Sequence, residues 1–394
     1  MFCYKLPCGD FQTLTTMTET GISFDPPVYE QRYCAAIQIL EDSRWSSQIK
    51  KVVEFGCAEM KLFQLMRRIE TIENILLVDI DEPLLRRNLT CVDPLVSDYI
   101  RRRAGPLSVQ ILQGSVADSS EELRGTDAVI ALELIEHVYD DVLYKIPSNV
   151  FGFMQPKLVV FSTPNSDYNV VFTRFNPLLP NGFRHYDHKF EWTREEFKSW
   201  CSDIVEKYPN YMFSLMGVGN PPKDFESVGH VSQMAIFVRK DFLEMQLEFP
   251  LDSTPKLDEE STPYKLIHSV DYPFYVDTRT EKEKMWTEVQ IEIQRFKRIA
   301  NSSDIDLDSH QDNYKMPLSL LLDRLHHVGA TKEDLVELLQ ENNLKIEEES
   351  VIIEDSEEES QWSDPYELSE RLSQDVVLTD QEQEEECWDL NSES

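Results

Sequence analysis

Five short β-rich segments recur along the first part of this sequence, each separated from the next by a stretch long enough for a helix. They occupy residues 51–55, 74–80, 108–112, 127–132 and 157–164. Crossovers of that length place consecutive strands parallel, with helices on both faces of the sheet. Residues 211–218 and 231–239 are further strand candidates. The pattern predicts an α/β domain with a mostly parallel sheet over residues 22–240.

The charge of the chain is concentrated outside this domain. The sequence has 38 Lys and Arg residues against 73 Asp and Glu residues, a net charge of −35. Residues 241–394 hold 41 of the acids and 13 of the bases, so they carry −28 of that charge. The acidity excludes a broad electrostatic grip on duplex nucleic acid, but it belongs mainly to an appendage.

Composition divides the chain into four expected parts. They are a flexible N-terminus (1–21), the main domain (22–240), a linker with helical segments (241–347) and an acidic disordered tail (348–394). Within the linker, residues 245–280 are rich in Pro, Asp, Ser and Thr, whereas 281–300 has apolar residues at helical spacing. A second helix is expected after Thr331, whose spacing to Asp334 is that of a capping box.

The cysteines and the apolar segments indicate the compartment. Seven dispersed cysteines include no CxxC pair and no zinc-ligand spacing. We see no secretory signal pattern, and no apolar run approaches the ~18 residues that span a bilayer. We therefore expect a reduced, soluble, intracellular protein with no membrane partner.

The first predicted strand ends in a glycine turn, and the second ends at an acid. The turn is residues 54–59 (EFGCAE), with Gly56 as its only glycine, and the acid is Asp79. Glycine lets the backbone approach a ligand at the carboxyl end of the sheet, where an acid so placed accepts hydrogen bonds from a ribose. A single glycine favours a ligand without phosphates, such as S-adenosylmethionine. An ordinary strand-to-helix turn is the alternative.

Gly114 and Ser115 follow the third predicted strand at the same edge of the sheet. Ser115, or the backbone beside it, is placed to read the edge of an adenine. The alternative is a structural Gly-Ser turn without a ligand.

The segment after the fourth strand carries the most chemical information. On a helix, Glu133, Glu136 and His137 fall at positions i, i+3 and i+4 and therefore share one face. Two carboxylates and an imidazole at the ligand edge of an open α/β sheet can hold a divalent cation. A solvated acidic helix face is the alternative. A fourth ligand would come from the loop at 184–193, where the spacing does not decide between His185 and His188.

With these residues assembled, the chain resembles the small-RNA 2′-O-methyltransferases, which methylate the 3′-terminal ribose of microRNAs and piRNAs. The resemblance covers roughly residues 22–240. It rests on residues 24–33 (FDPPVYEQRY), 54–59, 78–80, 114–116, 133–137, 162–165 (STPN) and 187–193 (DHKFEWT). The HKFEW and PPVYEQRY segments discriminate, because the ExxEHV motif alone is also similar to small-molecule O-methyltransferases of the ubiquinone type.

The resemblance implies a class I, Rossmann-like methyltransferase fold that uses S-adenosylmethionine. It implies that Glu54, Gly56, Cys57, Asp79 and Ser115 bind this cofactor. It also implies that Glu133, Glu136, His137 and His188 are the catalytic residues and hold a metal. One departure is Ala58, which stands where the family has the second glycine of Gly-Cys-Gly; the turn then avoids a positive φ there or accepts strain.

The implied reaction is metal-assisted methylation of the 2′-hydroxyl of the last nucleotide of a single-stranded small RNA, which protects the 3′ end. A metal that ligates both terminal hydroxyls would lower the pKa of the 2′-hydroxyl and orient its oxygen. Two imidazoles suit Mn²⁺ or Co²⁺ better than Mg²⁺, although Mg²⁺ is abundant. His137 or His188 is a candidate general base. Candidate RNA contacts are the side chains of Arg101, Arg102, Arg103, Arg174, Arg184 and Lys189.

Two rival functions stay open on the sequence. One is a small-molecule O-methyltransferase acting on a catechol-like diol, and the other is a non-enzymatic scaffold whose acidic tail binds basic partners. Only the family resemblance suggests an Argonaute/Piwi-type protein partner. We expect a monomer in the cytoplasm, where RNA granules are one fitting location.

Overall fold

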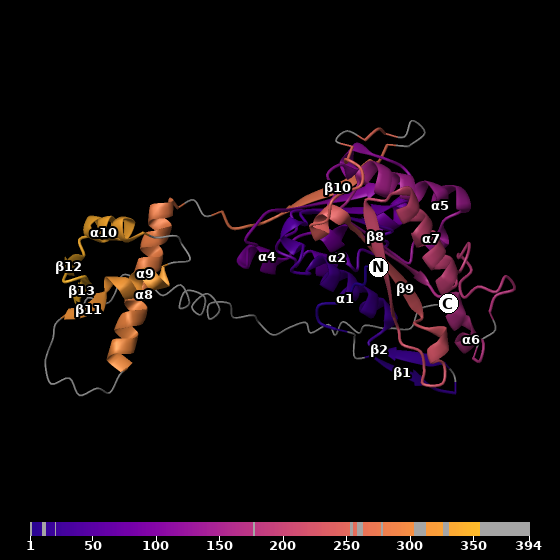
Figure 1. Cartoon of the computed structure of the whole chain (residues 1–394), viewed down its shortest axis with the longest axis horizontal. Helices are drawn as coiled ribbons and strands as arrows, with labels where there is room; N and C mark the ends of the chain where they lie inside the picture. Colours follow the sequence, from indigo (N-terminus) through magenta and orange to yellow (C-terminus); the bar gives the residue numbers. More distant parts are fainter. Residues whose placement is uncertain are drawn as a thin grey trace, which may run out of the picture. The chain divides into compact units, whose positions relative to one another are not determined.

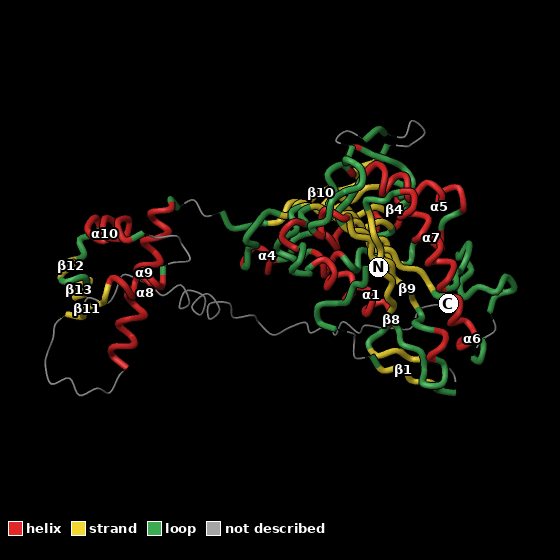
Figure 2. The backbone as a smooth tube through the Cα atoms, in the orientation of Figure 1, coloured by secondary structure: helices red, strands yellow, loops and turns green. Residues whose placement is uncertain are grey.

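The chain divides into two units, Met1–Val276 and Asp277–Ser394, in this computed structural model. The structure describes residues 2–9, 13–19, 21–175, 178–252, 255–257, 263–276, 279–302, 313–325 and 331–354. In Figure 1 the first unit contains a twisted sheet with helices against it, and Figure 2 shows the second as short strands among helices.

The first unit is built on an eight-stranded sheet of order β10-β5-β4-β3-β6-β7-β9-β8. The strands are β3 (Lys51–Phe55), β4 (Asn74–Asp79), β5 (Leu107–Gln113), β6 (Ala128–Leu132), β7 (Leu158–Pro164), β8 (Tyr211–Val218), β9 (Ser232–Arg239) and β10 (Lys265–Tyr272). Strands β3 to β7 pair in parallel, whereas β8, β9 and β10 run antiparallel to their neighbours. The predicted mostly parallel sheet is therefore confirmed, with every expected strand within about one residue of its bounds.

Apolar side chains alternate between the two faces of this sheet and build a core on each. Val52 belongs to one core and Val53 to the other, as the two-residue period of a strand requires. One face is covered by α1 (Val28–Leu40), α2 (Phe63–Met66) and α3 (Glu82–Arg87). The other is covered by α5 (Asp140–Pro147), the π-helical segment η5 (Ser148–Met154) and α7 (Arg194–Lys207). Helices on both faces are thus confirmed, and the carboxyl ends of the parallel strands stay open for a site.

The expected ends of the main domain were wrong on both sides. At the N-terminus, Tyr4 is 4% exposed and its ring centroid lies 5.7 Å from that of Trp45, so this segment belongs to the core of the unit. Strand β1 (Leu14–Met17) also pairs with β2 (Ile22–Asp25). After residue 240, the expected linker contains β10, which extends the sheet, so the unit continues to Val276.

The second unit has a core of its own where a linker and a tail were expected. Its sheet has the order β11-β13-β12, with β11 at Asn313–Pro317, β12 at Lys345–Glu347 and β13 at Ser350–Glu354. Helices α8 (Glu281–Ser302), α9 (Leu318–Arg324) and α10 (Lys332–Glu341) supply Val289, Leu321 and Leu335 to the core. The capping box of Thr331 and Asp334 is confirmed. Strand β13 falls inside the expected disordered tail, and residues 355–394 lie outside the described part.

Two further short helices of the first unit are α4 (Val96–Ile100) and α6 (Asn169–Phe172). No helix in the described part of the chain is long and apolar enough to cross a membrane. The described cysteines are all free thiols.

Candidate active site

The turn after β3 requires glycine at one position and strains the backbone at another. Gly56 has φ +72°, and a Cβ there would meet Leu134 Cδ1 at 2.9 Å. The N–H groups of Gly56 and Cys57 donate to the Val78 carbonyl at 2.8 and 3.3 Å, which folds the turn over the end of β4. Ala58 has φ +44°, so this chain accepts the strain that its missing second glycine creates.

Two carboxylates flank this turn. Asp79 Oδ2 accepts from the Ala58 N–H and Oδ1 from the Asp81 N–H, both at 3.0 Å. Glu54 is buried at 7% exposure, and its Oε2 has no hydrogen-bond partner among the described residues. Burial, and then the charge of Asp79, raises the pKa of Glu54 to about 8. A buried carboxylate with a free oxygen fits the ammonium group of S-adenosylmethionine, so these residues suit the implied cofactor.

The turns after β4 and β5 lie side by side. Asp79 pairs with Gln113 in the sheet, and the Gly114 N–H donates to the Asp79 carbonyl at 3.1 Å. Ser115 Oγ accepts from the Ala117 N–H at 3.2 Å. Ile80, which the sequence reasoning did not single out, is 72% exposed between these turns. An apolar side chain left open beside two polar turns suits the face of a nucleobase.

The ExxEH segment is not the helix that its spacing predicted. Glu133 adopts φ +50°, and only Ile135–His137 forms a single turn of 3₁₀ helix. Hydrogen bonds to β7 and β9 hold Glu133 in this conformation. Its N–H donates to Ser162 Oγ at 3.0 Å, and its Oε1 accepts from Ser162 Oγ and Ser232 Oγ, both at 2.8 Å. Strain held by specific bonds in this way is typical of functional sites.

Glu136 is fully buried with one free oxygen. Its Oε2 accepts from Thr163 Oγ1 at 2.9 Å, whereas its Oε1 has no hydrogen-bond partner among the described residues. Burial, and then the nearby charge of Glu133, raises the pKa of Glu136 well above its ordinary value. Arg32 lies 3.6 Å from Glu133 Oε2 and provides part of the balancing charge. An orphaned buried carboxylate oxygen fits a metal ligand.

Each of two imidazoles is oriented by a carboxylate. His137 Nδ1 lies 3.0 Å from Asp187 Oδ2, and His188 Nδ1 lies 2.6 Å from Glu191 Oε1. Because a carboxylate accepts the proton of Nδ1, the lone pair of each ring is on Nε2, which is free to ligate. The ring centroids are 5.0 Å apart. Sequence reasoning missed Asp187 and Glu191, although an acid three residues after His188 was a readable signal.

A third imidazole joins this cluster. One ring nitrogen each of His137, His185 and His188 lies within 4.8 Å of the others, whereas Glu133 and Glu136 are not part of that three-imidazole cluster. His185 Nδ1 accepts the Asp187 N–H at 3.2 Å, so its neutral ring carries the proton on Nε2. The hydrogen bonds therefore favour His137 and His188 as ligands and leave His185 as a donor.

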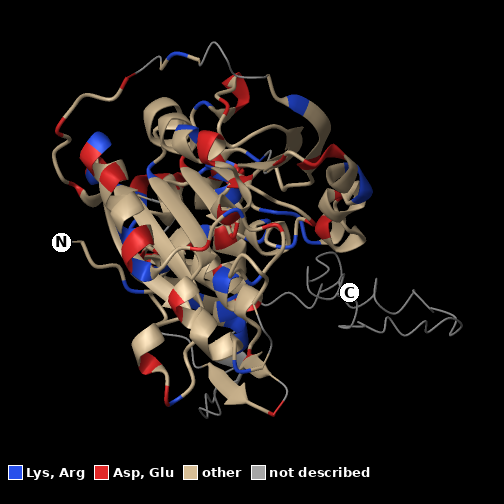
Figure 3. Cartoon of the chain, turned by 90° about the vertical axis from the view of Figure 1, so that its right-hand side faces the viewer, with Lys and Arg blue, Asp and Glu red and all other residues tan. Residues whose placement is uncertain are grey.

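Burial contradicts two of the expected RNA contacts. Arg103 is 8% exposed and donates to the carbonyls of Ile69 and Ile72, both at 3.0 Å. Arg184 is enclosed beside Glu191, with Nε 3.6 Å from Oε2. Both arginines satisfy buried acceptors and are structural. Arg101, Arg102 and Arg174 are exposed, and Figure 3 shows basic and acidic residues interspersed over the face in view.

The fold and the site together define a class of enzyme. A parallel sheet of order β5-β4-β3-β6-β7 with an antiparallel β9-β8 edge carries a glycine turn after β3 and acids near the end of β3, at the end of β4 and after β6, all at its carboxyl edge. Ligands of open α/β sheets bind at that edge. These are the features of a class I, Rossmann-like methyltransferase.

Comparisons with known proteins identify the family within this class. The chain is 75% identical to a small RNA 2′-O-methyltransferase of Drosophila melanogaster over 394 residues, which covers 100% of both chains. It is 37% identical to the one of Gallus gallus, over 70% of this chain and 69% of that protein. The chain belongs to the small RNA 2′-O-methyltransferase family, and the resemblance seen in the sequence is confirmed.

Two further matches concern the fold and the second unit. The crystal structure of the small RNA methyltransferase HEN1 matches with a TM-score of 0.50 and 28% identity, covering 66% of this chain and 29% of that chain. A family model described as the HEN1 methyltransferase C-terminal domain matches residues 282–355. The expectation that the family match stops near residue 240 was therefore wrong.

Proposed function

We propose that this chain transfers the methyl group of S-adenosylmethionine to the 2′-hydroxyl of the 3′-terminal nucleotide of single-stranded small RNAs. The observation that carries the proposal is the arrangement at the carboxyl ends of β6 and β7. There, two imidazoles with free Nε2 atoms share one loop cluster with Glu136, whose buried Oε1 is unpartnered among the described residues. The family membership supports the choice of a small RNA as substrate.

A divalent cation fits this set of nitrogen and oxygen donors. His137 and His188 would hold it through Nε2, and Glu133 and Glu136 through their carboxylates. When bound, the cation would supply a Lewis acid that lowers the pKa of a ligated hydroxyl. Asp187 and Glu191 keep the protons on Nδ1 of the two histidines, so both rings face the site as acceptors. Mg²⁺ or Mn²⁺/Co²⁺ are the candidate ions.

A hollow beside His188 has room for the end of an RNA chain. It measures about 610 Å³ and is lined by Tyr139, Asp140, Asp141, Asn181, Phe183, His188 and Lys189. Tyr139 is 66% exposed there, and Lys189 Nζ lies 4.9 Å from its ring centre. Two acids repel phosphates, whereas an aromatic ring attracts a base. We infer that the hollow takes the terminal base and that the backbone leaves on another side.

Variants of two metal-site residues test the proposal. Glu133→Ala and His188→Ala should each abolish methyl transfer while S-adenosylhomocysteine still binds. The reason is that, among the described residues, the hydrogen bonds and ion pairs of these two side chains go to β7, β9, Arg32 and Glu191 and not to the cofactor turns. A matched control is Glu195→Ala, an exposed acid on the same stretch of chain as His188. Calorimetry with S-adenosylhomocysteine and a labelled-methyl assay with added Mn²⁺ give the two readouts. Normal transfer by either site variant would contradict the metal assignment.

The family membership also supports finer assignments that extend the same proposal. The substrates would be piRNA-like RNAs, delivered by an Argonaute/Piwi-type protein to a monomeric enzyme in the cytoplasm or its RNA granules. Deleting residues 277–394 and measuring co-purification with such a partner tests a role of the second unit in delivery. Undiminished co-purification would contradict it.

A further inference from the structure

The strand β10 lies outside the expected methyltransferase domain, yet it begins beside the cofactor turns. It pairs antiparallel with β5, with Lys265 opposite Gln113 and Tyr272 opposite Leu107. Because the pairing is antiparallel, β10 begins where β5 ends. Residues 264–272, which we name the strap, therefore start at the turn that contains Gly114 and Ser115.

Tyr264 packs directly on this turn. Its hydroxyl donates to the Ser115 carbonyl at 2.6 Å, and the residue is 7% exposed. A Cβ placed on Gly114 would lie 2.4 Å from Tyr264 Cδ1, so the absence of a side chain at 114 makes room for the ring. Burial, and then the charge of Asp118, raises the pKa of Tyr264, which keeps the hydroxyl protonated as a donor.

The next residue of the strap reaches the neighbouring turn. Lys265 Nζ lies 2.6 Å from Glu82 Oε1, at the start of α3. Helix α3 is capped by Asp81, whose N–H donates to Asp79. The strap thus contacts the turns after both β4 and β5, on which Asp79, Ile80 and Ser115 are placed to bracket a nucleoside. The Lys265–Glu82 pair is partly exposed and contributes less than the buried hydroxyl of Tyr264.

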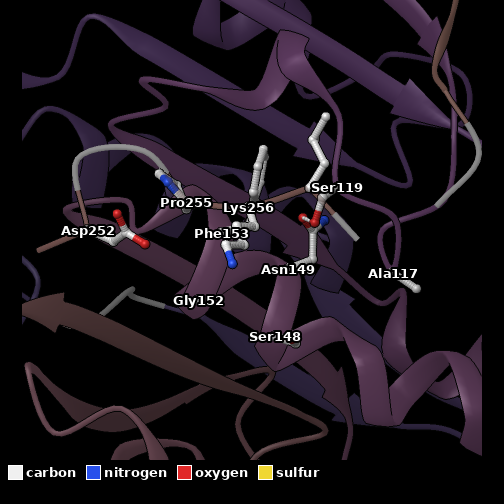
Figure 4. Close-up of a pocket in the computed structure, with 10 residues that line it drawn as sticks. Ala117, Ser119, Ser148, Asn149, Gly152, Phe153, Asp252, Pro255 and Lys256 are labelled. Atoms are coloured by element: carbon white, nitrogen blue, oxygen red, sulfur yellow. Dashed lines mark hydrogen bonds between the residues drawn. The ribbon is translucent and has the colours of Figure 1, made fainter. Parts of the chain in front are cut away.

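The segment that precedes the strap is also held to the first unit by contacts of its own. Arg124 Nη1 donates to the Pro255 carbonyl at 3.0 Å. A hollow of about 390 Å³ is lined by Asp252, Pro255, Lys256 and Leu257 together with Ser119, Asn149 and Phe153. Figure 4 shows these residues except Leu257 with their labels. This region after β9 therefore packs against the loop that follows Ser115 and against η5.

We propose that Tyr264, assisted by Lys265, is a positioning residue for the nucleoside half of S-adenosylmethionine. The strap fixes the Ser115 turn against the Asp79 turn, so the gap between them is set before the cofactor arrives. Removing the Tyr264 hydroxyl leaves the Ser115 carbonyl with the Asp118 N–H as its donor, at 3.0 Å, and removes the bond that holds the Ser115 turn to the strap. This inference rests on the proposed function, because it presumes that the two turns bind this cofactor.

The test compares two tyrosines on the same strand in the full-length chain. Tyr264→Phe removes the hydroxyl beside the cofactor turn. Tyr272→Phe removes a buried hydroxyl at the far end of the strap, which donates to the Val92 carbonyl at 2.8 Å and accepts from Arg67 Nη1 at 3.1 Å. The Kd of S-adenosylhomocysteine is measured by calorimetry for both variants, together with their melting temperatures.

The expected result is a Kd raised about five-fold in Tyr264→Phe, as the loss of one hydrogen bond predicts, and an unchanged Kd in Tyr272→Phe. Melting temperatures should fall in both variants, and further in Tyr272→Phe, whose hydroxyl makes two hydrogen bonds. Lys265→Met should raise the Kd about two-fold, and less in high salt. An unchanged Kd in Tyr264→Phe, or an equal rise in both tyrosine variants, would overturn the inference. Failure of the unaltered chain to bind S-adenosylhomocysteine would instead refute the proposed function.

Discussion

Replacing Glu191 with glutamine removes a charge that orders the loop of the proposed metal site. The side chain of Glu191 is 1% exposed, and its Oε1 accepts from His188 Nδ1 and the Arg184 N–H, both at 2.6 Å. Its Oε2 accepts from Asn169 Nδ2 at 2.7 Å. Glutamine has the same shape, but it offers one acceptor oxygen and an NH₂ group that faces donors. One of the three donors then loses its partner.

The size of the effect follows from the pKa of this carboxyl. Burial alone would raise it, but the hydrogen bonds from His188, Asn169 and Arg184 lower it from 4.5 to about 2. That difference corresponds to about 3 kcal/mol of folding stability. Because the folded pKa is the lower one, the contribution is fully present above about pH 4.5 and is lost as the pH falls toward 2.

Urea unfolding of the full chain at several pH values measures this contribution. Glu191→Gln should unfold about 3 kcal/mol more easily at pH 7, and the difference from the unaltered chain should shrink as the pH falls below 4.5. The variant should also bind Mn²⁺ about 10- to 100-fold more weakly, because His188 loses the partner that orients it. Glu195→Gln, at an exposed site, is the control. A difference in stability that is independent of pH would refute this electrostatic account.

Two further predictions concern the turn after β3 and the arginine cluster. Ala58→Gly should stabilise the chain by about 1 kcal/mol, since glycine adopts the φ of +44° without strain; a lower melting temperature would contradict the strained geometry. Arg103→Ala should lower the free energy of unfolding by about 3 kcal/mol and leave RNA affinity unchanged, because the guanidinium donates to buried carbonyls. Arg102→Ala, at an exposed position, should leave the free energy of unfolding unchanged. RNA binding lost in Arg103→Ala at unchanged melting temperature would contradict the structural role.

The strands of the sheet were predictable because buried parallel strands leave a clear signal. Val52, Val53 and the apolar run at 128–132 form short β-branched segments that end at glycine, acid or proline residues. Strand β10 escaped prediction for the opposite reason. It is an edge strand in which four of the eight residues are exposed and one is buried, and the polar residues His268 and Ser269 stand next to each other in its middle.

The position of the ExxEH segment at the carboxyl edge of the sheet was predictable, but its local geometry was not. The spacing of Glu133, Glu136 and His137 fits a helix and equally fits a short turn. What decides for the turn is the pair of hydroxyls from Ser162 and Ser232, which belong to β7 and β9. Bonds between segments this distant in sequence leave no periodic signal.

The second unit was missed because its sheet joins distant residues. Strand β11 at Asn313–Pro317 pairs with β13 at Ser350–Glu354, and the acidic composition around them predicts disorder. The apolar residues Met316, Leu335 and Val351 are sparse in sequence but meet in one core. A small number of buried side chains is enough to order a short unit of this kind.

The central claim is that the enzyme recognises the free 3′ end through both terminal hydroxyls at the site of His137 and His188. The direct measurement is labelled-methyl transfer with Mn²⁺ to three single-stranded RNAs that differ only in the last ribose: unmodified, 2′-deoxy and 3′-deoxy. The account predicts transfer to the unmodified RNA alone, since the 2′-oxygen accepts the methyl group and both hydroxyls are needed for chelation. Transfer to the 3′-deoxy RNA at the unmodified rate would contradict it.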